Sequence, residues 1–234
     1  MDLDRRQKLF LFLCCLFVTA LVVGDIIGGK LIEIHLAGLP FVMSVGSIPF
    51  PVTFLLTDVL NEFYGPKATR TITWIGFGMA IFTLMMVRIS VGLPWPEFTR
   101  APGWQGVTEG AFNNVFAGST RILLASMVAY LAAQFLDIAV FHALKRLSAN
   151  RYLWLRATGS TVASQLIDTV VIQALAWYGI LSGHQIGVLV VSSYVVKLAI
   201  AIGLTPLVYG AHVILEKKLG IHPVKLGVTT SISS

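Results

Sequence analysis

FPVTFLLTDVLNEFYG, which runs from Phe50 to Gly65, is an apolar segment of the kind found in membrane helices, yet it carries two carboxylates and an amide within about one turn. On a helix Asp58, Asn61 and Glu62 share one face, because residues three and four apart are neighbours. A charge near the middle of a bilayer costs about 2.5–3.5 kcal/mol on insertion scales. We therefore expect a partner inside the protein, a watery cavity or a ligand to offset this cost.

The whole chain has the composition of an integral membrane protein. Of its 234 residues, 56% are hydrophobic and 12% are charged, whereas an ordinary soluble domain carries about 25% charged residues. The net charge of +6 would suit a nucleic acid, but the basic residues lie between apolar segments rather than on one soluble face. We expect a single polytopic membrane domain over 1–234, with the lipid bilayer and not a nucleic acid as its partner.

Six segments are apolar and long enough, or nearly so, to be membrane spans. Basic residues precede the first segment, lie between the second and third and between the fourth and fifth, and follow the sixth. By the positive-inside rule, this alternation predicts an all-α integral membrane fold of six transmembrane helices with both termini in the cytoplasm. The predicted spans are 8–29, 49–65, 69–92, 119–144, 157–181 and 188–214.

Two of the predicted extracytoplasmic loops have structure of their own. Residues 30–48 alternate polar and apolar side chains around a Gly-Leu-Pro sequence, which predicts a small β-hairpin or a re-entrant segment between the first two helices. Residues 93–118 contain tryptophans that suit the membrane interface, and then a short helix near 109–116. This second loop is either a lid over an outward cavity or a passive interfacial loop.

The later spans also carry polar groups at membrane depth. Gln165 and Asp168 share a helical stripe in the fifth predicted span, and Asp168 falls near its middle. Lys197 lies about ten residues into the sixth span, with Tyr194 one turn away. The simplest interpretation is a set of structural ion pairs, such as Lys197 with Asp168.

Acids outnumber bases among these deep residues, which favours a ligand over mutual pairing alone. We expect Lys197 to be the single deep cation, and Arg121 to be available to pair with Asp25 nearer the membrane surface. An excess of carboxylates implies either protonation or a donor-rich or cationic ligand. Phe50, Phe54 and Tyr194 lie near the cluster and could stack on a flat ligand, although core packing explains any one of them better. The four deep acids are Asp58, Glu62, Asp137 and Asp168.

The residues of these segments resemble the signature of the bacterial queuosine precursor transporters, also described as a vitamin uptake transporter family. The resemblance begins with FPVTFLLTDVLNEFYG, includes Arg121, and extends over the second to sixth predicted spans. Further matching motifs are AYLAAQFLD (129–137), GSTVASQLIDT (159–169), YVVK (194–197) and the Thr-Pro pair at 205–206.

The resemblance implies a multi-pass protein of the bacterial cytoplasmic (inner) membrane that imports 7-cyano-7-deazaguanine, 7-aminomethyl-7-deazaguanine or both. A carboxylate can accept both the ring N–H and the exocyclic amine of a deazaguanine edge, and Lys197, Asn61 or Gln165 can donate to its carbonyl. Glu62 or Asp168 is the expected contact of that edge, supported by Asp58. The expected substrate-binding residues are Asp58, Asn61, Glu62, Gln165, Asp168, Lys197, Tyr194 and Phe54.

Two other classes of function remain open at this point. One is a substrate-binding membrane subunit for a related vitamin-like heterocycle, energised by separate ATPase partners, since the sequence contains no phosphate-binding GxxxxGK[ST] loop. The other is an intramembrane aspartyl-type enzyme built on Asp58 and Asp168. Neither a HExxH helix nor metal-ligand spacing occurs, so we expect no metal, no cofactor and no enzymatic activity. The spacing of Gly24 and Gly28 suits close helix packing and allows a homodimer.

Overall fold

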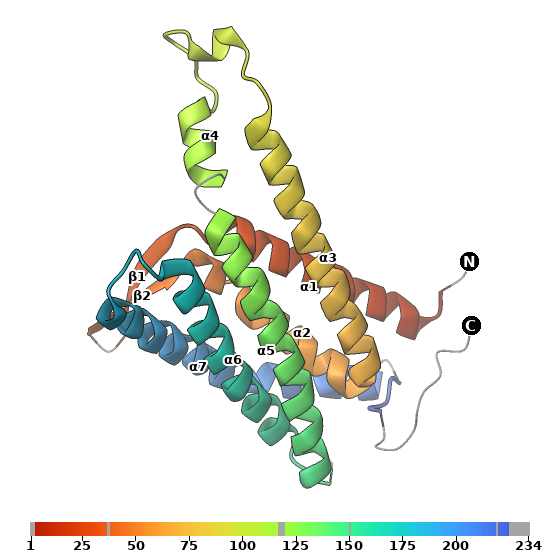
Figure 1. Ribbon diagram of the computed structural model, residues 1–234. Helices are drawn as coiled ribbons and strands as arrows, with labels where there is room; N and C mark the ends of the chain where they lie inside the picture. The colour runs from red at the N-terminus through yellow and green to blue at the C-terminus, as the bar shows by residue number, and fades with distance from the viewer. Residues whose placement is uncertain (1–2, 37, 117–119, 150, 219, 225–234) are drawn as a thin grey trace.

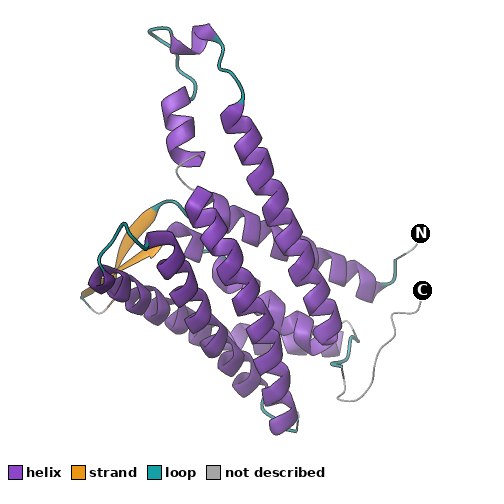
Figure 2. Ribbon diagram, viewed as in Figure 1, coloured by secondary structure: helices purple, strands orange, loops and turns teal. Residues whose placement is uncertain are grey.

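The computed structural model describes residues 3–36, 38–116, 120–149, 151–218 and 220–224. Figures 1 and 2 show a bundle of helices with one small hairpin at its edge. The helices are α1 (Arg5–Ile27), α2 (Phe50–Phe63), α3 (Gly65–Gly92), α4 (Glu109–Phe116), α5 (Thr120–Leu147), α6 (Leu153–Trp177) and α7 (Gly183–Val213). The strands are β1 (Leu31–Leu36) and β2 (Leu39–Ser44), and the short helical turns are η1 (Val45–Ser47), η2 (Glu97–Arg100) and η3 (Ile214–Lys218).

The expected all-α membrane protein is confirmed. Four stretches are long and apolar enough to cross a bilayer, namely Arg5–Ile27, Gly65–Gly92, Gly183–Lys217 and Glu109–Leu147, the last of which includes α4, α5 and the three residues 117–119 that the structure does not describe. The 14 residues of α2 make about 21 Å of helix, less than the roughly 30 Å of a bilayer core. The 25 residues of α6 are sufficient in length, but a polar stretch runs through them. Six spans and cytoplasmic termini stay a prediction.

Local sequence explains where several helices begin and end. A capping box opens α1, in which Asp4 Oδ1 accepts the Gln7 N–H at 2.7 Å and the Gln7 side chain accepts the Asp4 N–H at 3.1 Å. Ser182 and Gln185 form the same arrangement at the start of α7. Between α2 and α3 the backbone turns at Gly65, whose φ of +81° favours glycine.

The expected hairpin is present between α1 and α2. Strands β1 and β2 pair antiparallel, from Leu31 opposite Ser44 at the open end to Leu36 opposite Leu39 at the turn. The Ser44 hydroxyl then donates to the Gly28 carbonyl at 2.6 Å, which ties the hairpin to the end of α1.

Gly24 of α1 and Gly28 at its end pack against other residues of the same chain. A Cβ added at Gly46 would lie 2.6 Å from the Gly24 carbonyl oxygen and 3.0 Å from the Gly28 Cα. The face that the sequence suggested for a homodimer is therefore filled by η1 of the same chain. A dimer, which stays a prediction, would need another surface.

Helix α2 lies at the centre of the fold. It contacts α1, α3, α5 and α7, and ten of its residues are buried. Both ends of the described chain meet at its C-terminal end, where the Arg6 guanidinium donates to the Phe63 carbonyl at 2.7 Å and the Val224 N–H donates to the Glu62 carbonyl at 2.9 Å. Figure 1 shows the start of α1 and the C-terminal end of α7 on the same side of the bundle.

The loop between α3 and α5 contains the short helix that the sequence predicts. Helix α4 covers 109–116 as expected and packs on α3. Figure 1 shows η2 and α4 projecting beyond the remainder of the bundle together with the end of α3. None of the described residues of this loop lines the cavities discussed below, so the arrangement gives no support to the lid interpretation.

Candidate functional site

The C-terminal half of α2 is held by a buried cluster of three charges. Glu62 Oε2 accepts from Lys145 Nζ at 3.0 Å, and Glu62 Oε1 accepts from Arg156 Nη2 at 2.7 Å. The three side chains are at most 4% exposed. Both carboxylate oxygens of Glu62 are thus engaged by cations, which fixes α2 against α5 and α6.

Two of these charged residues, Lys145 and Arg156, do not lie where the sequence predicted. Lys145 and Arg156 were assigned to a cytoplasmic loop, outside the predicted spans that end at 144 and begin at 157. Helix α5 instead continues to Leu147 and α6 starts at Leu153, so both cations lie inside helices and point to Glu62. Lys197 is therefore not the single buried cation. The missed signal is a basic residue that lies four positions or fewer from a predicted span end and can reach an unpaired acid in another span.

A second ion pair joins α6 to α7. Lys197 Nζ donates to Asp168 Oδ2 at 2.8 Å, and the two side chains are 10% and 5% exposed. The same nitrogen lies 4.3 Å from the centre of the Phe50 ring, close enough for a cation–π interaction. The pairing of Lys197 with Asp168, which the sequence offered as the structural alternative to a ligand, is thus present. Phe50, at the start of α2, covers it.

Two cavities lie on either side of Phe50 and Lys197 within the described part of the chain. The first, here called the hairpin cavity, has a volume of about 100 Å³ and is walled by α1, the hairpin with η1, and parts of α2, α5, α6 and α7. The second, the central cavity, has about 30 Å³ and lies between α2, α6 and α7. Phe50 and Lys197 line both, and Asp168 lines the hairpin cavity. The two cavities therefore share the side chains of Phe50 and Lys197 as part of their walls.

The central cavity is lined by Asp58 and Gln165, two residues whose side chains include buried polar atoms without a partner among the described residues. Asp58 Oδ1 and both polar atoms of the Gln165 carboxamide are buried and have no hydrogen-bond partner among the described residues. Asp58 is 5% exposed and Gln165 is 2% exposed. Buried polar groups are normally paired, and leaving one unpaired costs about 1–3 kcal/mol. Such groups on a cavity wall are suited to a ligand that supplies the missing donors and acceptor.

Apolar and hydroxyl groups complete this cavity. The Phe54 ring packs on the Phe50 ring with centroids 5.0 Å apart and lines the cavity from α2. Thr158 and Thr205 are in hydrogen-bond contact at 3.2 Å and face it from α6 and α7. The cavity thus offers an aromatic ring beside a carboxylate and an amide.

Other predicted polar residues lie outside the cavities. The Asn61 carbonyl oxygen is 3.3 Å from His142 Nε2, whereas its Nδ2 has no partner in the described chain. Asp137 accepts from the Ser164 hydroxyl at 3.2 Å through one oxygen, and its other oxygen is unpartnered. The Tyr194 hydroxyl donates to the Val162 carbonyl at 3.1 Å, which joins α7 to α6.

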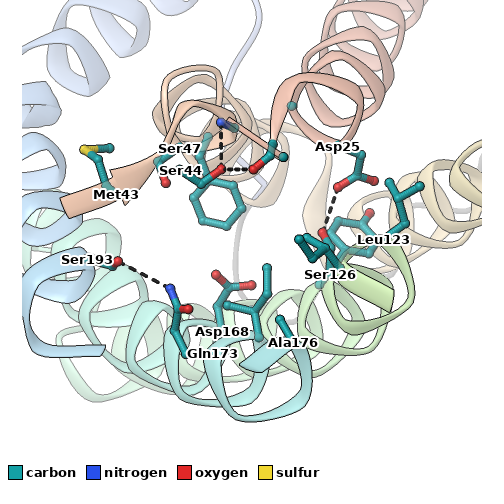
Figure 3. Close-up of a pocket in the computed structure, with 18 of the residues that line it drawn as sticks. Asp25, Met43, Ser44, Ser47, Leu123, Ser126, Asp168, Gln173, Ala176 and Ser193 are labelled. Carbon is teal, nitrogen blue, oxygen red and sulfur yellow. Dashed lines mark hydrogen bonds between the residues drawn. The ribbon is translucent and has the colours of Figure 1, made fainter. Parts of the chain in front are cut away.

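The expected pair of Arg121 and Asp25 does not form. Arg121 donates instead to the backbone carbonyls of Leu175 and Tyr178, at 3.0 and 2.5 Å, because it lies beside the C-terminal end of α6 where helix carbonyls lack partners. Asp25 accepts from the Ser126 hydroxyl at 2.7 Å and faces the hairpin cavity (Figure 3).

The fold therefore brings together five of the eight predicted binding residues and leaves three apart. Asp58, Gln165, Phe54, Asp168 and Lys197 surround the two cavities. Glu62, Asn61 and Tyr194 line neither cavity, and their described contacts are with other helices.

Comparison with known proteins gives a consistent result. The family model "Putative vitamin uptake transporter" matches residues 44–211. The chain is 34% identical over 169 residues to the "Probable queuosine precursor transporter" of Bacillus subtilis (strain 168), covering 72% of this chain and 71% of that protein. It is 30% identical to the "Queuosine precursor transporter" of Escherichia coli (strain K12), over 63% of this chain and 61% of that protein. No solved structure matches.

Long apolar helices around buried polar cavities, together with these relatives, define a multi-pass transport protein of the bacterial inner membrane and not an enzyme. The match over 44–211 covers most of the chain and includes α2, α3, α5, α6 and most of α7. The chain belongs to the vitamin uptake transporter family described by that model. The resemblance noted in the sequence is thereby confirmed.

Proposed function

We propose that this protein imports queuosine precursors, 7-cyano-7-deazaguanine, 7-aminomethyl-7-deazaguanine or both, across the cytoplasmic membrane. The names of the B. subtilis and E. coli relatives support this substrate class. The whole chain acts as one transport domain in this proposal. Its substrate enters from the side of the hairpin and passes between α2, α6 and α7.

The observation that carries the proposal is the pair of unpartnered side chains in the central cavity, Asp58 and Gln165. A deazaguanine presents a ring N–H and an exocyclic amine side by side, and one carboxylate accepts both. The Asp58 carboxylate takes this role, and the Gln165 amide donates to the ring carbonyl. Phe54 stacks on the flat rings.

Asp58 replaces Glu62 as the expected contact of the guanine-like edge. Glu62 already accepts from two cations, so a substrate would have to displace Lys145 or Arg156 to reach it. Its role in the proposal is to hold α2 in place. Asn61 remains a candidate through its free Nδ2, and Tyr194 supports the α6–α7 contact.

Asp168 and Lys197 control passage between the cavities in this proposal. A solute in the hairpin cavity meets Phe50 and this ion pair before it reaches Asp58. Opening the path requires the Phe50 ring to move and Lys197 to leave either Phe50 or Asp168. Movement of α7 against α2 would accomplish both, because Phe50 and Lys197 belong to those two helices.

Six spans with both termini in the cytoplasm complete the proposed topology. The meeting of the two chain ends at the C-terminal end of α2 supports placing them on one side. Lys67 and Arg70 follow at the start of α3, on that same side, as the positive-inside rule requires of a cytoplasmic end. The hairpin then lies outside.

Two versions of the proposal differ in the source of energy for transport. A secondary carrier or facilitator needs no partner, whereas a binding subunit for a related vitamin-like heterocycle would need separate ATPase subunits. Purified protein in liposomes decides between them. Uptake of a labelled deazaguanine by this chain alone supports the carrier, and uptake that appears only after adding ATPase subunits and ATP supports the binding subunit.

Direct binding tests the substrate class. We expect both 7-deazaguanines to raise the melting temperature of the purified protein, because a ligand that binds only the folded state stabilises it. Guanine should do so more weakly, and a pteridine serves as a second flat heterocycle. No shift with either deazaguanine at millimolar concentration would contradict the proposal.

A further inference from the structure

The hairpin cavity contains a carboxylate for which the proposed function has no use. Figure 3 shows Asp25 facing the cavity from α1, across from Asp168 on α6. The half-buried Asp25 lies in a helix long and apolar enough to span the membrane, where a charge needs compensation.

Neighbouring cations do not compensate Asp25. Lys197 is the cation of this cavity and is committed to Asp168 at 2.8 Å. Arg121 is committed to two backbone carbonyls at the end of α6. Among the described residues Asp25 forms no ion pair, and it accepts a hydrogen bond from the Ser126 hydroxyl at 2.7 Å. The cavity therefore holds two carboxylates and one amine.

The wall that carries Asp25 is fixed before any ligand arrives. Gly24, beside it in sequence, packs against the backbone of Gly46, and the Ser44 hydroxyl is bonded to the Gly28 carbonyl at 2.6 Å. The final turns of α1 are thus held by the end of the hairpin. A carboxylate on a preorganised wall binds a partner without first having to be ordered.

Hydrogen-bonding groups for a neutral ring lie on the opposite side. The Gln173 Nε2 donates to the Ser193 hydroxyl at 3.4 Å, which is a long hydrogen bond. The carboxamide oxygen of Gln173 takes no part in this contact and is available to a ligand. Both residues line the cavity in Figure 3. The site thus pairs one uncompensated negative charge with neutral polar groups.

We propose that the hairpin cavity is an entry subsite for a small heterocycle bearing a protonated amine, with Asp25 as the counter-charge of that amine. This inference rests on the proposed function and adds a preference to it. The aminomethyl form of the precursor carries such an amine, whereas the cyano form is neutral. Asp25 therefore selects the aminomethyl compound before either compound reaches Asp58.

Dissociation constants of the two compounds for the full-length protein in detergent test the subsite. The proposed subsite predicts that wild-type protein binds the aminomethyl compound more tightly than the cyano compound. Asp25→Asn weakens that affinity about tenfold, the loss expected for one charge-assisted hydrogen bond, and changes the affinity for the cyano compound by less than about twofold. Asp25→Glu retains the preference. Glu33→Gln is the matched control, because Glu33 is an exposed carboxylate of β1 outside the cavity.

Each outcome is distinguishable. Equal loss of both affinities in Asp25→Asn, or no loss of either, overturns the subsite and leaves the proposed function standing. Binding of neither compound by the wild-type protein overturns both. Retained binding of the cyano compound shows that the Asn variant is folded. Where that variant does not fold, equal wild-type affinities for the two compounds overturn the subsite.

Discussion

The amine of Lys197 donates to the carboxylate of Asp168 at 2.8 Å and so joins α7 to α6. The pair lies where the hairpin cavity and the central cavity meet. A buried ion pair adds little net stability, but removing one partner leaves an uncompensated charge and costs about 3–5 kcal/mol. In the proposed transport path the pair has a second role, because Lys197 borders both cavities and a solute moving between them would meet it. Stability and transport can therefore be separated at this pair.

Neutralising both members of this pair should restore stability without restoring transport. Asp168→Asn or Lys197→Met alone should lower the melting temperature and abolish uptake, whereas the double variant should melt near the wild-type temperature and remain inactive. Melting in detergent and uptake into liposomes provide the two readouts. Wild-type uptake by Asp168→Asn would contradict its assignment to the transport path.

The three-charge cluster around Glu62 should behave as a structural element. Glu62→Gln leaves Lys145 and Arg156 buried without a full counter-charge, so we expect a loss of about 3–5 kcal/mol in stability and reduced protein in the membrane. Glu109→Gln is the control, because its pair with Arg100 is exposed and should contribute at most about 1 kcal/mol. Similar melting temperatures for the two variants would contradict the structural role.

Gln165 should affect binding without supporting the fold. Its carboxamide has no hydrogen-bond partner among the described residues, so Gln165→Leu removes a cost rather than a contact and should leave the melting temperature unchanged or raised. Binding of a deazaguanine should weaken about tenfold through the lost donor. Gln134→Leu is the matched control: Gln134 is equally buried and accepts from Thr57, so that variant should lose stability and keep its affinity.

The sequence was sufficient to predict the helical membrane class, the hairpin and several polar residues that the fold places around the two cavities. Period and composition predicted the membrane helices, and alternation predicted the hairpin at residues 30–48. Asp58, Gln165, Asp168 and Lys197 were found because charged or amide groups in apolar helices are costly and must have a reason. That argument depends on sequence alone.

The sequence could not show which carboxylate was already neutralised. Lys145 and Arg156 looked like loop residues because helix ends are the least certain part of a sequence prediction. The rotation of α5 and α6 about α2 decides whether these cations face water or Glu62, and that rotation follows from packing over three helices. The same packing, not spacing, placed η1 on the glycines of α1.

The contact between α1 and η1 should be sensitive to a single methyl group. Gly46→Ala would place a Cβ 2.6 Å from the Gly24 carbonyl oxygen, so backbone must shift, and we expect a loss of about 1–3 kcal/mol. Gly78→Ala is the matched control, since nothing lies within 4 Å of its added Cβ in α3 and a helical alanine should stabilise by about 0.5–1 kcal/mol. Equal melting temperatures for both variants would contradict the packing described.

Cysteine labelling can establish the side of the membrane on which the hairpin lies. In a chain with Cys14 and Cys15 replaced by alanine, Lys67→Cys at the exposed start of α3 should react with a membrane-impermeant maleimide only after the cells are opened. His35→Cys, on the exposed side of β1, should react in intact cells. The two positions control for each other, because a leaky membrane would label both. Labelling of Lys67→Cys alone in intact cells would show that the topology is the reverse of the proposed one. The hairpin cavity would then lie on the cytoplasmic side, where it could release a solute but could not admit one from outside.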